Sequence, residues 1–93
     1  MSTEELDSHT LAIYLEVPGN KVVLLQGIFE NYEGLATVRT LDIRKSLVCI
    51  LTTRSVREDC MAALEGIKEL VPWREVERPE EASKIMGYFR GQQ

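Results

Sequence analysis

The sequence contains few of the residues that carry catalysis or metal binding. His9 is the only histidine and lies in a polar N-terminal segment, so we expect neither a histidine base nor a histidine-based metal site. The two cysteines, Cys49 and Cys60, form no CxxC pattern, and we predict that both are buried free thiols. We therefore expect no catalytic residues, no metal and no cofactor, and a protein that is not an enzyme.

Long apolar runs are also missing. Runs such as residues 22–25 and 47–51 are far shorter than the roughly 20 residues of a membrane-spanning helix. The first residues, MSTEELDSHT, are acidic and polar, unlike a secretory signal. The net charge of −4 argues against a general attraction to nucleic acid. These absences predict a cytoplasmic protein without membrane contact.

What the sequence does contain is enough for one domain. Residues 1–9 lack an apolar period and are predicted to be a flexible N-terminal tail, which leaves residues 10–93 as a single domain. A chain of 93 residues buries only roughly 60–65% of its unfolded surface, so pairing with a second copy would add useful burial.

Apolar periodicity predicts the regular elements. Leu11, Ile13, Leu15 and Val17 alternate with less apolar residues, as in a strand, and the run 47–51 is apolar throughout. A helix is expected after the Pro18-Gly19 turn, with Gly34 as its left-handed C-cap. The predicted order is strand 11–17, helix 20–32, strands 35–41 and 47–51, helix 55–71, strand 73–78 and a short helix after Pro79.

The second helix has the most specific local signal. Ser55 and Glu58 match the capping box S-x-x-E, in which each side chain satisfies a backbone donor of the other residue. Pro72 is expected to end the helix. The apolar stripe expected to face the core is Val56, Cys60, Ala63, Leu64, Ile67, Leu70 and Val71.

These elements predict an α+β fold, a ferredoxin-like βαββαβ sandwich with a short C-terminal helix. Right-handed crossovers place both long helices on one face of an antiparallel sheet of strand order four, one, three, two. The other face is partly apolar because of residues such as Ala12 and Tyr14. Either the last helix, with Ala82, Ile85, Met86 and Phe89, or a second subunit is expected to cover it.

The stretch VPGNKVVLLQGIFENYEGLATVRTL resembles the first half of ACT domains, small ligand-sensing modules of amino-acid metabolism. That resemblance implies a ferredoxin-like fold, sheets paired side by side in a dimer, and an effector near the first turn. The best-spaced match places Gly19 at the acidic position and Val22 at the glycine position of the ACT pattern, so the resemblance supports the fold but not effector binding. The whole chain also resembles short bacterial proteins grouped as a family of unknown function.

Two groups of residues are candidates for binding. Pro18, Gly19 and Asn20 form a strand-to-helix turn that either offers backbone N–H groups to an anion or is a plain turn. Arg39, Arg44 and Lys45, followed by Arg54 and Arg57, form either an anion or nucleic-acid patch or a set of solvated charges. The predicted third strand has no aromatic residue on which RNA bases would stack.

We therefore expect a small regulatory or protein-interaction domain that senses a small-molecule effector at the interface of a homodimer. The alternative is a nucleic-acid-binding module that uses the basic residues around Arg44. The homodimer has its own alternative, a monomer in which the last helix folds back over the open sheet face.

Overall fold

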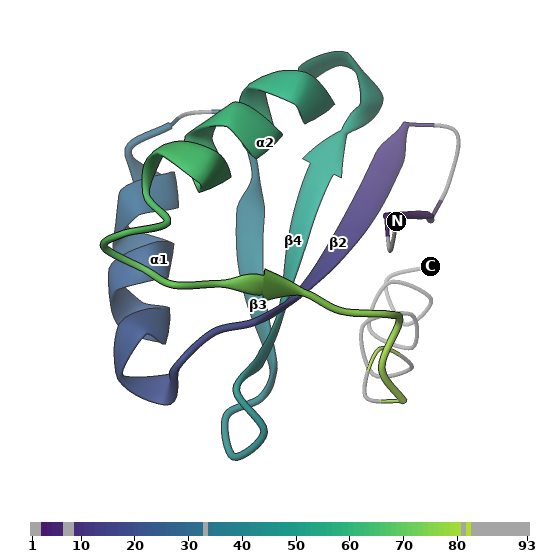
Figure 1. Ribbon diagram of the computed structural model, residues 1–93. Coiled ribbons are helices and arrows are strands. Elements are labelled where there is room, and N and C mark those ends of the chain that lie inside the picture. Colours follow the sequence, from purple (N-terminus) through teal and green to yellow (C-terminus); the bar gives the residue numbers. More distant parts are fainter. Residues whose placement is uncertain (1–2, 7–8, 33, 81, 83–93) are drawn as a thin grey trace.

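The computed structural model describes residues 3–6, 9–32, 34–80 and 82, which form an α+β sandwich (Figure 1). In this part of the chain a five-stranded antiparallel sheet is covered on one face by two α-helices. The elements are β1 (Glu4–Glu5), β2 (Thr10–Glu16), the 3-10 turn η1 (Gly19–Lys21), α1 (Val22–Glu30), β3 (Thr37–Asp42), β4 (Leu47–Thr53), the 3-10 turn η2 (Arg54–Val56), α2 (Arg57–Gly66) and β5 (Arg74–Glu75).

The centre of the sheet consists of β2 and β4. They pair antiparallel along their full lengths, from Thr10 opposite Thr53 to Glu16 opposite Leu47. Residues 11–15 and 48–52 are buried without interruption. This confirms the prediction that these two strands are central, because a strand that is apolar on both sides needs cover on both faces of the sheet.

Both α-helices pack on the same face, as the right-handed crossovers predict (Figure 1). We call it the helix-side face. Leu25 of α1 and Leu64 of α2 are completely buried against it, and Phe29 is 3% exposed. The core on this face consists of Ile13, Leu15, Val17, Val22, Leu25, Phe29, Val48, Ile50, Cys60, Leu64, Val71 and Trp73.

The outer edge beyond β4 is formed by β3, which is connected to β4 by a tight hairpin. The Asp42 carboxylate accepts hydrogen bonds from the backbone N–H groups of Arg44 and Lys45, at 2.9 and 3.3 Å. Ser46 completes the turn with a φ of 60°. The pairing of β3 with β4 shifts register between Thr40 and Asp42, an irregularity that bends an edge strand away from regular pairing.

The opposite edge, beside β2, differs from the expected arrangement. β1 pairs with the start of β2 and β5 pairs with its end, while β4 occupies the other edge of β2. The path is β1-β2-β4-β3, and β5 also pairs with β2. The predicted order of four, one, three, two refers to β5, β2, β4 and β3, so it omits β1, which shares the edge of β2 with β5. The reason is that β5 pairs over only two residues between Pro72 and Pro79, which leaves room on this edge for Glu4–Glu5 of the predicted tail.

The capping box predicted for the second helix is wrong. Ser55 lies inside η2, and its hydroxyl is 3.2 Å from that of Thr53. Thr53, with an extended backbone, occupies the N-cap position of η2, and neither it nor Val56 at the start of α2 makes a side-chain cap bond. The helical turn begins two residues earlier than expected, so Ser55 has no N-cap geometry.

Both α-helices end earlier than predicted. α1 ends at Glu30, and Gly34 has the expected left-handed backbone, with a φ of 77°, in the turn that follows. α2 ends at Gly66, and the chain then runs through hydrogen-bonded turns to Val71. Because this segment is no longer α-helical, Leu70 leaves the predicted stripe and is 54% exposed, whereas Val71 is buried.

The second face of the sheet, which we call the chain-end face, is covered by segments from both ends of the described chain. Its buried cluster contains Ala12, Tyr14, Leu41, Cys49, Leu51 and Ala82, and the side chains of Leu6, Leu47 and Val76 pack against it. Tyr14 is only 1% exposed. The predicted last helix, with Ile85, Met86 and Phe89, lies outside the described residues.

Candidate functional site

The first turn of the chain lies against the tip of the β3–β4 hairpin. Pro18, Gly19 and Asn20 are exposed, and the latter two begin η1. The backbone N–H of Val17 donates to the carbonyl of Ser46 at 2.7 Å, which holds the end of the first strand segment against the hairpin. The fold thus brings one predicted binding segment next to part of the other.

A hollow of about 360 Å³ opens between these two segments and the residues that lead into β5. We call it the first-turn hollow. Pro18 and Lys45, one from each predicted group, are among its lining residues, whereas Gly19, Asn20 and Arg44 are not. The lining residues are Glu16, Pro18, Lys45, Ser46, Pro72, Trp73 and Arg74. Its volume lies at the lower end of the range typical of small-molecule sites.

The charges of the hollow are one carboxylate and two cations. Arg74 donates from Nη2 and Nε to Oε1 of Glu16, at 2.7 and 3.3 Å. Lys45 adds a second positive charge to the lining. An anionic group of a small ligand would be attracted to it.

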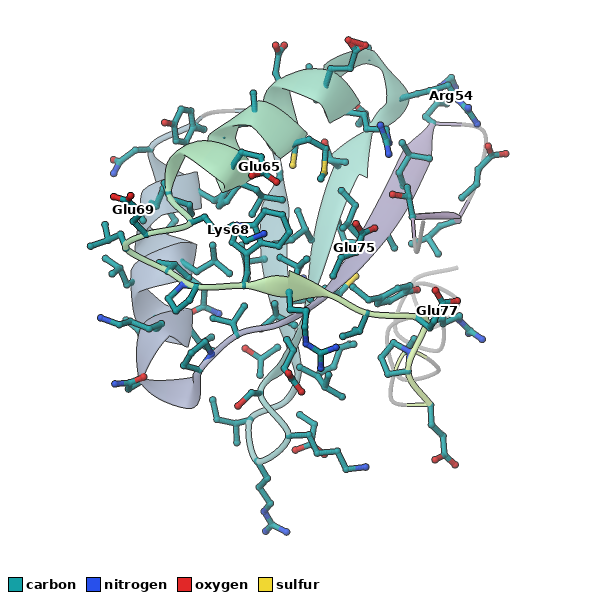
Figure 2. All side chains as sticks on the ribbon, in the orientation of Figure 1. Arg54, Glu65, Lys68, Glu69, Glu75 and Glu77 are labelled. Atoms are coloured by element: carbon teal, nitrogen blue, oxygen red, sulfur yellow. The ribbon has the colours of Figure 1, made fainter. Side chains whose placement is uncertain are left out.

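Trp73 forms the rigid part of the wall. Its indole N–H donates to the carbonyl of Leu64 at 2.7 Å, and the side chain is only 6% exposed. The ammonium nitrogen of Lys68, labelled in Figure 2, lies 4.2 Å from the centre of the indole ring. The sequence alone gave Trp73 no role at a binding site, because the residues before β5 reach the first turn only through the pairing of β5 with β2.

The predicted basic residues do not form one patch. β4 has seven residues and therefore spans roughly 20 Å, with Arg44 and Lys45 before its first residue and Arg54 and Arg57 beyond its last. At that far end Arg54, labelled in Figure 2, pairs with Glu5. Arg57 donates to the hydroxyl of Thr3 at 3.5 Å. Arg39 lies on β3, away from both groups.

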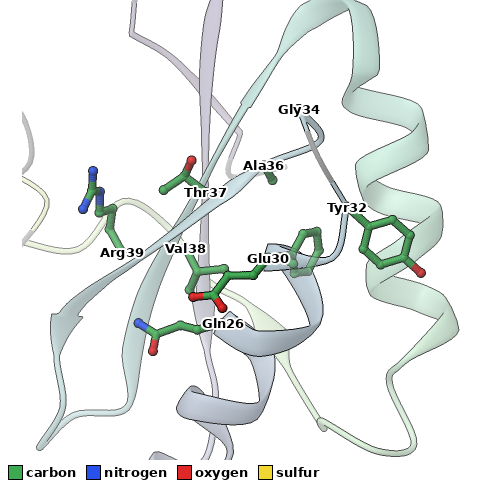
Figure 3. Close-up of a pocket in the computed structure, with 9 residues that line it drawn as sticks. Gln26, Glu30, Tyr32, Gly34, Ala36, Thr37, Val38 and Arg39 are labelled. Atoms are coloured by element: carbon green, nitrogen blue, oxygen red, sulfur yellow. The ribbon is translucent and has the colours of Figure 1, made fainter.

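Arg39 lines a different cavity, the groove between α1 and β3 (Figure 3). This groove has a volume of about 470 Å³. Figure 3 shows Gln26 and Glu30 of α1 beside Val38, with Arg39 pointing away from them. Its lining includes the carboxylate of Glu30 and the amide of Gln26, and its two walls are the helix and the outermost strand.

The two cysteines are buried free thiols, as predicted. Burial raises the pKa of the Cys60 thiol above its ordinary value of 9.0, although a hydrogen bond with Thr52 and the charge of Arg57 act in the opposite direction. A thiol that is buried and held protonated is a poor nucleophile. His9 is exposed, and the described residues contain no cluster of three or more His, Cys, Asp or Glu side chains suited to a metal ion.

None of the helices in the described part of the chain is long and apolar enough to cross a bilayer. No curated protein and no solved structure matches the chain. Residues 15–71, more than half of the sequence, do match a family. The match begins inside β2 and ends just before Pro72, so it includes both α-helices and the β3–β4 hairpin. The chain therefore belongs to the family described as Domain of unknown function (DUF4911).

Proposed function

We propose that this protein is a non-enzymatic regulatory domain that binds a small anionic ligand in the first-turn hollow. The observation that carries the proposal is the meeting of Pro18 and Lys45, from separate segments, on one hollow of suitable size. Lys45 would attract a carboxylate or phosphate group, while Pro18 and Trp73 would contact the apolar part of the ligand.

The architecture supports this proposal. Helices on one face of an antiparallel sheet, with β2 and β4 in the centre, agree with a ferredoxin-like sandwich, the fold that the resemblance to ACT domains implies. In ACT domains the effector lies near the first turn, which corresponds here to Pro18 and Gly19. We extend the resemblance to the place of binding and not to the identity of the ligand.

We also propose that the protein is a homodimer. Several large apolar side chains remain exposed in the described subunit, among them Val23 at 77% and Ile43 at 57%. A small domain gains stability when such surface is buried against a second copy. In this arrangement the ligand would regulate the interactions of a dimer.

Trp73 provides a direct test, because it is the only tryptophan and lines the hollow. Amino acids, nucleotides and inorganic phosphate should be titrated against the indole fluorescence, with the melting temperature measured in parallel. A ligand of the hollow should change both signals, and Lys45→Gln should weaken its binding by about tenfold.

Arg44→Gln is the matched control, because it removes a charge at the neighbouring position without altering the lining. Equal weakening by both substitutions would mean that only the general charge of the hairpin matters, and the proposed site would be wrong. A short oligonucleotide that binds when the small anions do not would favour the nucleic-acid alternative.

A further inference from the structure

The two edges of the sheet are protected to different degrees. On the edge of β2, β1 and β5 have two residues each, and Pro72 and Pro79 lie on either side of β5. Short strands and prolines are common protection against pairing with another chain. β3 has six residues, and none of the described strands pairs with its outer edge. Its pairing with β4 is regular from Thr37 to Thr40, so this stretch has the geometry with which an extended chain can pair.

A cavity lies beside β3 on each face of the sheet. On the helix-side face, Val38 packs against the core and lines the groove of about 470 Å³ between α1 and β3 (Figure 3). On the chain-end face, a hollow of about 330 Å³ is lined by Thr37 and by its partner across the sheet, Leu51, which belongs to the buried cluster of that face. Successive side chains of a strand point to opposite faces. A strand added beside β3 would therefore have room for its side chains on both faces.

We infer that β3 binds an extended, basic peptide segment of another protein, which adds a strand to the sheet at this edge. Backbone hydrogen bonds to residues 37–40 would hold the peptide, and the two cavities would select its alternate side chains. The first-turn hollow shares no lining residue with either cavity, so this is a second binding surface and does not depend on the proposed ligand.

The groove between α1 and β3 favours a basic side chain. Its lining includes the carboxylate of Glu30 and the apolar side chains of Phe29 and Val38. Figure 3 shows Glu30 beside Val38, with Arg39 pointing away from Glu30. A lysine or arginine can place its methylene groups against such a wall and its charge beside the carboxylate. The hollow on the chain-end face is lined by Thr37 and three other threonines, which suits a polar side chain at the next position of the peptide.

A second copy of the chain fits this edge less well. In an antiparallel pairing of two β3 strands, the helices of both copies lie on the same face of the continuous sheet. The groove of one copy would then receive Val38 or Thr40 of the other, because these residues share the helix-side face of β3. Neither side chain has a charge to pair with Glu30. The chemistry of the groove therefore points to a different chain.

Selection from a library of random peptides of about eight residues, displayed on phage and bound to the full chain, tests the inference. The enriched peptides should share a lysine or arginine. Glu30→Lys should weaken the binding of a selected peptide by about tenfold or more, and replacing the basic residue of the peptide by glutamate should reverse this preference. Glu65→Lys, which makes the same change of charge at an exposed position of α2, is the matched control and should leave binding unchanged.

Hydrogen exchange of the full chain, measured by NMR with and without the selected peptide, locates the binding. Alternate amides within residues 37–40 should exchange about tenfold more slowly or less in the complex, because an added strand pairs with every second residue of an edge. Lys45→Gln should leave this protection unchanged, so failure of the first-turn hollow is distinguishable from failure of this surface.

Three results would overturn the inference. The first is a selection that enriches no peptide, or peptides that protect amides elsewhere in the chain. The second is equal binding of the selected peptide to the original chain and to Glu30→Lys. The third is protection of the same β3 amides at high protein concentration without any peptide, which would assign this edge to a second copy.

Discussion

The two faces of the sheet are covered in different ways. In the described residues the helix-side face has a cluster of twelve buried residues, and α1 and α2 both contribute side chains to it from successive helical turns. The cluster on the chain-end face has six, and the side chains that pack over it include Leu6, Val76 and Ala82 from opposite ends of the described chain. Both faces exclude water from the central strands, but among the described residues the α-helices with a periodic apolar pattern cover only the helix-side face.

This difference explains why burial of the chain-end face is harder to anticipate. Tyr14 is 1% exposed, and in the described chain Leu6, Val76 and Ala82 from separate segments belong to or pack against its cluster. A short segment without a repeat covers a side chain only if the segment is held beside it, and here hydrogen bonds to the sheet hold the segment. The backbone N–H of Val76, for example, donates to the carbonyl of Tyr14 at 2.9 Å.

The largest effect is expected on the helix-side face. Leu25→Ala should lower the free energy of unfolding by about 2–5 kcal/mol, because Leu25 is fully buried and its removal leaves a cavity between α1 and the sheet. Chemical denaturation measures the loss. A value below about 0.5 kcal/mol would show that α1 does not contribute to a packed core.

A smaller effect is expected on the chain-end face. Leu41→Ala should cost about 2 kcal/mol, near the lower end of the range for such substitutions, because Leu41 lies at the irregular part of an edge strand and is 6% exposed. The same denaturation experiment applies. If Leu41→Ala cost as much as Leu25→Ala, the two faces would contribute equally to the free energy of unfolding. They would then differ only in the residues that cover them.

Trp73 tests how firmly β5 is joined to the helix-side face. Trp73→Phe removes the indole donor to the carbonyl of Leu64 and should cost about 1–2 kcal/mol, the value of one buried hydrogen bond with some loss of packing. Lys68→Met serves as the control, since it removes only the cation beside the ring. Equal losses in the two variants would assign the stability to the cation contact rather than to the hydrogen bond.

The smallest effect is expected at Ser55, which belongs to neither face. Its side chain is exposed and caps no helix, so Ser55→Ala should change the free energy of unfolding by less than about 0.5 kcal/mol. Thermal and chemical denaturation should agree on this result. A loss of about 1 kcal/mol would mean that the hydroxyl does act as an N-cap in solution.

Much of the fold follows from the sequence because it depends on short repeats. The alternation from Leu11 to Val17 and the apolar run from residue 47 to 51 identify the central strands, since few other arrangements would bury both of their faces. The prediction of a capping box at Ser55 was wrong because a short motif does not fix where the helical turn begins. A match of two residues specifies a helix start only if the preceding backbone is extended, and here the turn begins at Arg54.

The candidate site shows the same limit. The sequence singled out Pro18 and Lys45 separately, but no local pattern connected either of them with Trp73 or with the Glu16–Arg74 ion pair. That ion pair joins residues 58 positions apart, which face each other only because β5 pairs with β2. Similarly, the basic residues 44–57 are close in the sequence, whereas β4 separates them into two groups at opposite ends of the strand.

The sequence by itself determined the α+β class, the two central strands, the core-facing stripe of the second helix apart from Leu70, and the left-handed glycine at position 34. Each depends on the spacing of residues within one segment, where side-chain periodicity and backbone sterics are local. Tertiary structure alone decided which segments share the edge of β2, what covers Tyr14, and how Pro18, Lys45 and Trp73 come to line one hollow. These depend on competition between distant segments for hydrogen bonds and buried surface, and that competition is settled only when the whole chain has folded.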